Sequence, residues 1–174
     1  MRLDNGKMVD LSGTRILGIY LMDMIGHNHD TENNIFQISP GTNSSSLRLA
    51  WQAHIASNLW NACSIKWNKK EERRGKGRGT RSADDTIPPI AEFPQLSGEV
   101  RLPEDPRSTL FNTDAQIFSD CGIPVVLFME NYDINRTGYH DTKDNMQNID
   151  LDYGAALAAI AIETVARVAT LRKI

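Results

Sequence analysis

Two short stretches of the chain are almost entirely apolar, and polar or turn-forming residues bound each of them. Residues 15–22, RILGIYLM, and residues 123–130, IPVVLFME, contain β-branched and aromatic side chains. Short apolar runs of this kind are typical of strands that are buried on both faces of a sheet. We therefore predict a strand in each stretch, with Pro124 tolerated at the start of the second one.

Three other segments show the apolar spacing of a helix. Residues 44–62 repeat apolar side chains every three to four positions after a run of serines that can cap the start, and the pattern stops at residue 63. Residues 114–122 predict a short helix that ends at Gly122. Residues 150–173 give the strongest helical pattern in the chain. The apolar face predicted for this last helix consists of Leu157, Ile160, Ala161, Val165 and Val168.

The region between the first and second predicted helices is less regular. Residues 82–108 hold five of the seven prolines, which favours extended or irregular chain, with SGEVRL at 97–102 as the best strand candidate. We interpret residues 1–174 as one domain that carries a basic and proline-rich insertion at about 63–110. Apolar strands that alternate with amphipathic helices predict an α/β fold with a mainly parallel sheet.

Ligands of such sheets bind beyond the carboxyl ends of the strands, so the two segments that follow the predicted strands are of interest. The segments DMIGHNHD and ENYDINRTGYHDTKDN contain three of the four histidines. Imidazole and carboxylate groups are common ligands of zinc. Taken singly, each of these side chains is better explained as a solvated loop residue or a helix cap. Their joint placement at one sheet edge favours a site.

The quoted segments also carry a family resemblance. LMDMIGHN and TDAQIFSDCGIPVVLFMEN, followed by GYHDTKDNMQNIDLDYGAALAAIAIETVARVA, resemble the C-terminal half of the zinc aminopeptidase family, over residues 15–30 and 111–170. The resemblance implies a three-layer α/β/α fold of the phosphorylase/hydrolase-like type and a site with two zinc ions. It also implies an exopeptidase that hydrolyses N-terminal peptide bonds with metal-activated water.

The resemblance assigns roles to individual residues. It implies that Asp23 binds one zinc ion and that His140 binds the other. Asp114 matches an aspartate of the active-site hydrogen-bond network in relatives such as glutaminyl cyclases, although Ala115 stands where the family often has histidine. The residues expected at the rim of the pocket are His27, His29, Glu130, Tyr139 and Asp144, of which Asp144 could instead orient its loop or cap the last helix.

Other elements of the family pattern are missing from this sequence. The family has a His-x-Asp and a Glu-Glu pair upstream of the strand that Asp23 ends, whereas residues 1–22 contain neither histidine nor glutamate. We therefore expect an incomplete domain from a longer enzyme, inactive by itself and prone to form homo-oligomers through uncovered apolar surface. Two alternatives stay open, a glutaminyl cyclase-like acyltransferase and a non-catalytic binding domain of the same fold.

The distribution of charge suggests a further class of partner. The net charge is −3, yet residues 69–81 contain seven basic and two acidic residues. Such a tract could bind a nucleic acid backbone, but it lacks aromatic residues and the rest of the chain is acidic, so a solvated loop is the better interpretation. The sequence has no apolar run of about 18 residues and no secretory signal, so we expect no membrane partner. It leaves cytoplasmic and exported locations open.

Overall fold

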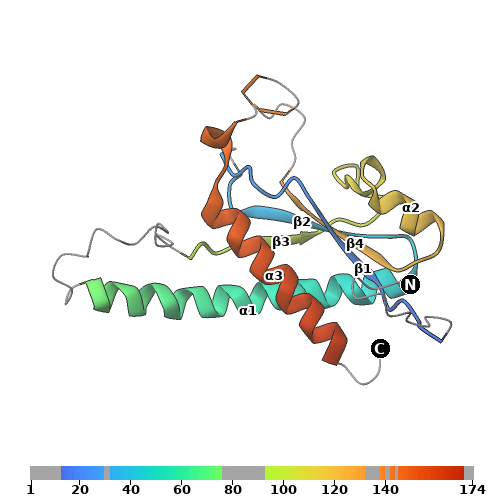
Figure 1. Cartoon of the computed structure of the whole chain (residues 1–174), viewed down its shortest axis with the longest axis horizontal. Helices are drawn as coiled ribbons and strands as arrows, with labels where there is room; N and C mark the ends of the chain where they lie inside the picture. The colour runs from blue at the N-terminus through green and yellow to red at the C-terminus, as the bar shows by residue number, and fades with distance from the viewer. Residues whose placement is uncertain are drawn as a thin grey trace, which may run out of the picture.

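The computed structural model describes residues 13–29, 32–75, 93–131, 138–139, 142–143 and 145–170, with the backbone alone for 71–75. Within these residues the chain forms four strands, three α-helices and two short 3₁₀ turns (Figure 1). The strands are β1 Ile19–Asp23, β2 Ile35–Pro40, β3 Ser97–Val100 and β4 Val125–Glu130. The helical elements are α1 Ser44–Gly75, η1 Leu110–Asn112, α2 Ala115–Asp120, η2 Met146–Asn148 and α3 Leu151–Thr170.

The strands form one sheet in the order β1-β4-β2-β3. The pairs β1–β4 and β2–β3 are parallel, and the central pair β2–β4 is antiparallel. The prediction of a mainly parallel sheet is therefore confirmed. Because β2 runs against its neighbour β4, its first residues lie beside the last residues of β4, and Phe36 pairs with Glu130.

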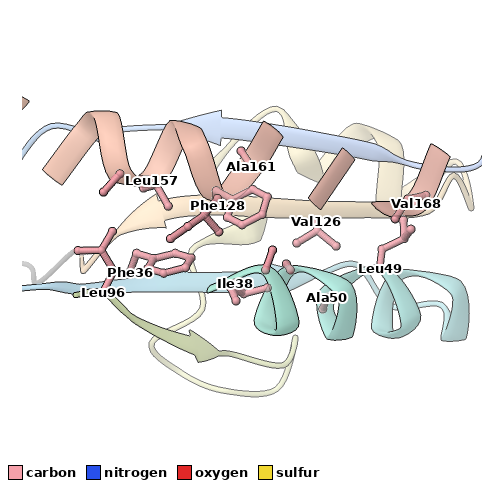
Figure 2. Close-up of a cluster of buried hydrophobic side chains, with 14 of the residues drawn as sticks. Phe36, Ile38, Leu49, Ala50, Leu96, Val126, Phe128, Leu157, Ala161 and Val168 are labelled. Carbon is pink, nitrogen blue, oxygen red and sulfur yellow. The ribbon is translucent and has the colours of Figure 1, made fainter. Parts of the chain in front are cut away.

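Helices cover both faces of the sheet, which gives the three layers that we predicted. Helices α1 and α3 cross over one face, and α2 lies apart from them beside the sheet (Figure 1). The core under α1 and α3 contains Phe36 and Ile38 of β2 and Val126 and Phe128 of β4, and Figure 2 shows these side chains between the strands and the two helices. On the other face, α2 and η1 pack on a smaller cluster, whose buried members are Leu110, Ala115, Val125, Leu127 and Met129.

The two strands predicted from apolar runs are confirmed, but both begin later than predicted, at Ile19 and Val125. The segment 97–102 contains β3, as expected. Strand β2 was not predicted. Its sequence, IFQISP, has polar residues at Gln37 and Ser39, which make the segment resemble a loop. In the structure these two side chains are fully buried, because both faces of the strand are covered.

Helix α1 extends well beyond residue 62, so the prediction that the helical pattern stops at 63 is wrong. Trp67 packs against Trp60 and Phe93, with ring centroids 5.5 and 5.2 Å apart, and Asn68 exchanges two hydrogen bonds with the backbone of Phe93. These tertiary contacts add turns to the helix. The basic tract is consequently helical up to Gly75, and not a loop throughout as we expected, while its residues 76–81 lie outside the described part.

Helix α3 matches its prediction in position, and residues 171–174 lie outside the described part. Leu157, Ile160, Ala161 and Val168 are buried as predicted, whereas Val165 is exposed. Among the described helices, α3 alone is long and apolar enough to cross a membrane by length and composition. The same criterion is met by helices that pack in a protein core, as α3 does here, so it is weak evidence for a membrane and leaves the compartment open.

Candidate functional site

Three chain segments meet at one edge of the sheet. Strands β1 and β4 both end there, with Asp23 paired with Met129 and Glu130 following at once. Strand β2 begins there, because it is antiparallel to β4. The sequence-based expectation that Asp23 and Glu130 lie at the same carboxyl edge is therefore confirmed, and the described residues that follow β1, 24–29, lie next to the end of β4.

The chain turns sharply directly after Asp23. Met24 has φ of +47°, a backbone conformation that costs a residue with a side chain about 1 kcal/mol or more. Its carbonyl oxygen accepts a hydrogen bond of 2.9 Å from the backbone N–H of Glu130. The end of β4 thus stabilises the turn that sets the direction of the chain at Asp23.

Glu130 is the most deeply buried acidic residue at this edge, with 1% of its surface exposed. Its Oε2 atom accepts hydrogen bonds from the backbone N–H groups of Gly26, at 3.0 Å, and His27, at 2.7 Å. Its backbone carbonyl accepts another from Nε2 of Gln37, at 3.1 Å. A carboxylate is stable in a buried place when such donors surround it, and hydrogen bonds to an ionised acceptor are the stronger ones.

A second set of hydrogen bonds ties the same loop to the start of α3. The backbone N–H of Asp150 donates to the carbonyl of Gly26 at 2.8 Å, and Nδ2 of Asn28 donates to Oδ2 of Asp150 at 2.9 Å. The other carboxylate oxygen of Asp150 accepts from the backbone N–H of Tyr153, at 2.9 Å, in the manner of a helix cap. Asn28 also bonds Asn34 in both directions, which closes the loop on itself before β2.

The two histidines of this loop lie next to each other. The rings of His27 and His29 are 5.6 Å apart between centroids and nearly perpendicular. His27 is buried, with 7% of its surface exposed, whereas His29 is exposed. We predicted both at the rim of a pocket, and that role stays a prediction.

The other predicted site residues are more widely distributed. Asp114 occupies the N-cap position of α2, is exposed, and makes no capping hydrogen bond through its side chain within the described residues. Tyr139 is exposed. His140 and Asp144 lie outside the described residues, as do Asp30, Asp133 and Asp141.

The described residues do not by themselves make up a zinc site. Zinc in proteins takes four ligands, or three and a water. Among the residues that the structure describes, no three histidine, cysteine, aspartate or glutamate side chains lie close enough to hold a metal ion. Of the two predicted ligands, Asp23 is described and His140 is not, so the zinc prediction stays a prediction.

Sequence reasoning missed the residues that build this edge. Asn28, Gln37 and Asp150 each make hydrogen bonds between segments that are distant in the sequence. Asp150 could be recognised as a helix start, because it directly precedes the apolar pattern of α3. No sequence signal marks Gln37, whose partners are decided only by the way in which β2 lies beside β4.

The comparison with family models supports the resemblance. The model of peptidase family M28 matches residues 79–165, which is half of the chain and includes β3, α2, β4 and most of α3. The chain therefore belongs to peptidase family M28, a family of peptide hydrolases. The matched range contains Asp114, Glu130, Tyr139, His140 and Asp144, whereas Asp23, His27 and His29 lie upstream of it. Neither the curated proteins nor the solved structures contain a match to the chain.

Proposed function

We propose that the chain is part of a zinc-dependent aminopeptidase that removes residues from the N-terminus of peptides. The observation that carries this proposal is the family match over 79–165, which includes His140, together with the parallel pairing of β1 with β4. That pairing puts Asp23 at the edge from which the matched segment 131–150 departs. Family membership supports peptide hydrolysis, and the choice of an exopeptidase rests on the resemblance of the two quoted segments.

In this proposal Asp23 and His140 bind different zinc ions, and Asp114 belongs to the surrounding hydrogen-bond network. Zinc supplies a Lewis acid for the scissile carbonyl and for water. His27, His29, Tyr139 and Asp144 border the substrate site. Glu130 stabilises the chain that follows Asp23, since its carboxylate accepts hydrogen bonds from the backbone N–H groups of Gly26 and His27.

The proposal includes an expectation for the 174-residue chain by itself. Residues 1–22 supply no histidine and no glutamate, so the His-x-Asp and Glu-Glu elements that the family has upstream of the Asp23 strand do not precede Asp23 in this sequence. Two ligands that belong to two different ions hold zinc weakly. We therefore expect weak zinc binding and no cleavage of an aminoacyl reporter by the isolated chain.

Two measurements test these statements. Zinc competition with a chromogenic chelator should show weak binding by the wild-type chain and still weaker binding by Asp23→Asn and His140→Ala, with Asp120→Asn, at an exposed position, as a matched carboxylate control. Adding a separate polypeptide that carries His-x-Asp and Glu-Glu should raise zinc affinity and produce peptidase activity. Tight stoichiometric zinc or clear cleavage by the chain alone would contradict the expected inactivity. Equal zinc affinity of the wild type and both variants would refute the ligand assignment.

A further inference from the structure

Glu130 forms hydrogen bonds through its backbone N–H, its backbone carbonyl and its Oε2 atom at the junction between β4 and the residues that follow β1. Its backbone N–H bonds Met24, its carbonyl bonds Gln37, and its carboxylate bonds the N–H groups of Gly26 and His27. These bonds reach the connection at three of the first four residues after Asp23. One buried residue at the end of β4, through its backbone and its side chain together, therefore fixes the path of the backbone that leaves β1.

The opposite side of the same backbone is closed by the start of α3. A Cβ atom added at Gly26 would lie 3.1 Å from Cδ1 of Ile149, and one added at Gly154 would lie 3.1 Å from the carbonyl oxygen of Ile25. The N–H of Asp150 bonds the carbonyl of Gly26 from this side. Residues 25–27 are thus held between the Glu130 carboxylate and the first turn of α3, with no room for a side chain at Gly26 unless Ile149 moves.

We propose that Glu130 is a positioning residue of the candidate site. Its buried carboxylate holds the backbone of Gly26 and His27, while its backbone N–H holds Met24, so that this residue sets the path of the chain after Asp23 and the place of the His27 ring. The importance of this for catalysis rests on the proposed function, in which Asp23 is a metal ligand. The positioning itself is a property of this chain and can be measured without activity.

The experiment compares Glu130→Ala and Glu130→Gln with the wild-type full chain by NMR. In Glu130→Ala, the amide protons of Gly26 and His27 should exchange about 10- to 100-fold faster, the factor expected when a hydrogen bond to a charged group is lost. Glu130→Gln keeps an acceptor oxygen and should restore most of the protection. The ring signals of His27 and His29 should differ in the wild type, because the rings meet edge to face and only His27 is buried. They should converge in Glu130→Ala and separate again in Glu130→Gln.

Thr164→Val is the matched control, because Thr164 is fully buried in α3 and bonds Ile160 within its own helix. It should speed exchange evenly, including at Val126 and Phe128 of β4, without a selective effect on Gly26 and His27. If Glu130→Ala does not fold, Glu130→Gln still gives a result: its histidine ring signals should match those of the wild type. Even acceleration in Glu130→Ala, or unchanged exchange at Gly26 and His27, would overturn the proposal.

The outcomes separate this proposal from the proposed function. Selective loosening of Gly26 and His27 together with failure of the zinc and peptidase assays would leave the positioning role intact and reject the metal assignment. Zinc binding and peptidase activity of the complemented chain, with no effect of Glu130→Ala on residues 24–29, would reject the positioning role and leave the metal assignment intact.

Discussion

Helices α1 and α3 cover one face of the sheet with aromatic and aliphatic side chains, whereas the other face of β2 is polar although it is also buried. On the first face, Phe36 and Phe128 lie 6.1 Å apart between ring centroids, under α3. On the second, Gln37 accepts hydrogen bonds from Ser39 and from Thr109, and the guanidinium of Arg101, 2% exposed, bonds Glu99 and Asn131.

The difference shows that burial is achieved in two ways in one sheet. Apolar side chains need only close packing, and they tolerate exchange for others of similar volume. Buried polar side chains need particular partners at hydrogen-bond distance, because an unpaired one costs free energy. The polar face also contacts the candidate site directly, since Gln37 bonds the backbone of Glu130.

The largest expected effect is on the apolar face. Phe128→Ala should lower the free energy of unfolding by about 3–5 kcal/mol, because Phe128 is fully buried and its loss leaves a cavity beside Phe36 and Tyr20. Denaturant unfolding measures the change. Phe111→Ala is the control, as Phe111 is 38% exposed and should cost much less. Equal losses for the two variants would contradict the expectation that a buried side chain of the apolar face stabilises the fold more than an exposed aromatic one does.

On the polar face, Arg101→Met should cost about 2–3 kcal/mol. Removing one partner of a buried pair usually costs about 3–5 kcal/mol, and the loss is smaller here because Glu99 is 33% exposed and keeps Arg107 as a partner. Arg107→Met, at an exposed position, should leave the unfolding midpoint unchanged within error. A larger loss for Arg107→Met than for Arg101→Met would reverse our assignment of the buried cation.

Alkaline pH should lower the stability of the protein through two tyrosines of the apolar face. Burial raises the pKa of Tyr153 and of Tyr20 above the ordinary value near 10, and the charge of Asp150 adds to the effect at Tyr153. A raised folded-state pKa means that the stability is fully present below about pH 10 and falls as the pH rises further. For Tyr153 the slope is at most about 1.4 kcal/mol per pH unit.

Unfolding midpoints measured between pH 8 and pH 12 test this prediction. The fall above pH 10 should be weaker in Tyr153→Phe and in Tyr20→Phe, and unchanged in Tyr139→Phe, whose ring is exposed. An alkaline loss of stability that persists in the double variant of Tyr20 and Tyr153 would point to other groups.

The smallest effect concerns the contact between Gly154 of α3 and Ile25, which follows β1. Replacing glycine by alanine inside a helix normally stabilises by about 1 kcal/mol, but at Gly154 the new Cβ would lie 3.1 Å from the carbonyl oxygen of Ile25. We expect Gly154→Ala to gain less than about half of that amount, or to lose stability. Ala155→Gly, at an exposed position of the same helix, measures how much the difference in helix propensity between alanine and glycine contributes to the free energy of unfolding. A full gain of about 1 kcal/mol for Gly154→Ala would mean that Ile25 moves easily to make room for the new methyl group.

Much of the apolar face could be predicted from the sequence. Continuous apolar runs marked β1 and β4, and the spacing of Leu157, Ile160, Ala161 and Val168 marked the buried side of α3. The polar face could not be predicted in the same way. Strand β2 was missed because Gln37 and Ser39 interrupt its apolar run, and the extra turns of α1 depend on Phe93, which is 26 residues beyond Trp67 in the sequence.

The same distinction between features that the sequence predicts and features that only the structure shows applies to the candidate site. Sequence alone located Asp23 and Glu130 after the two apolar strands, and the motif around His140 indicated the family that the match over 79–165 confirmed. Only the tertiary structure decided that Glu130 turns its carboxylate toward the N–H groups of Gly26 and His27, and that Asp150 closes the loop from the other side. The physical reason is range: periodicity and motifs record neighbours along the chain, whereas a buried hydrogen bond depends on which distant segment the sheet brings beside it.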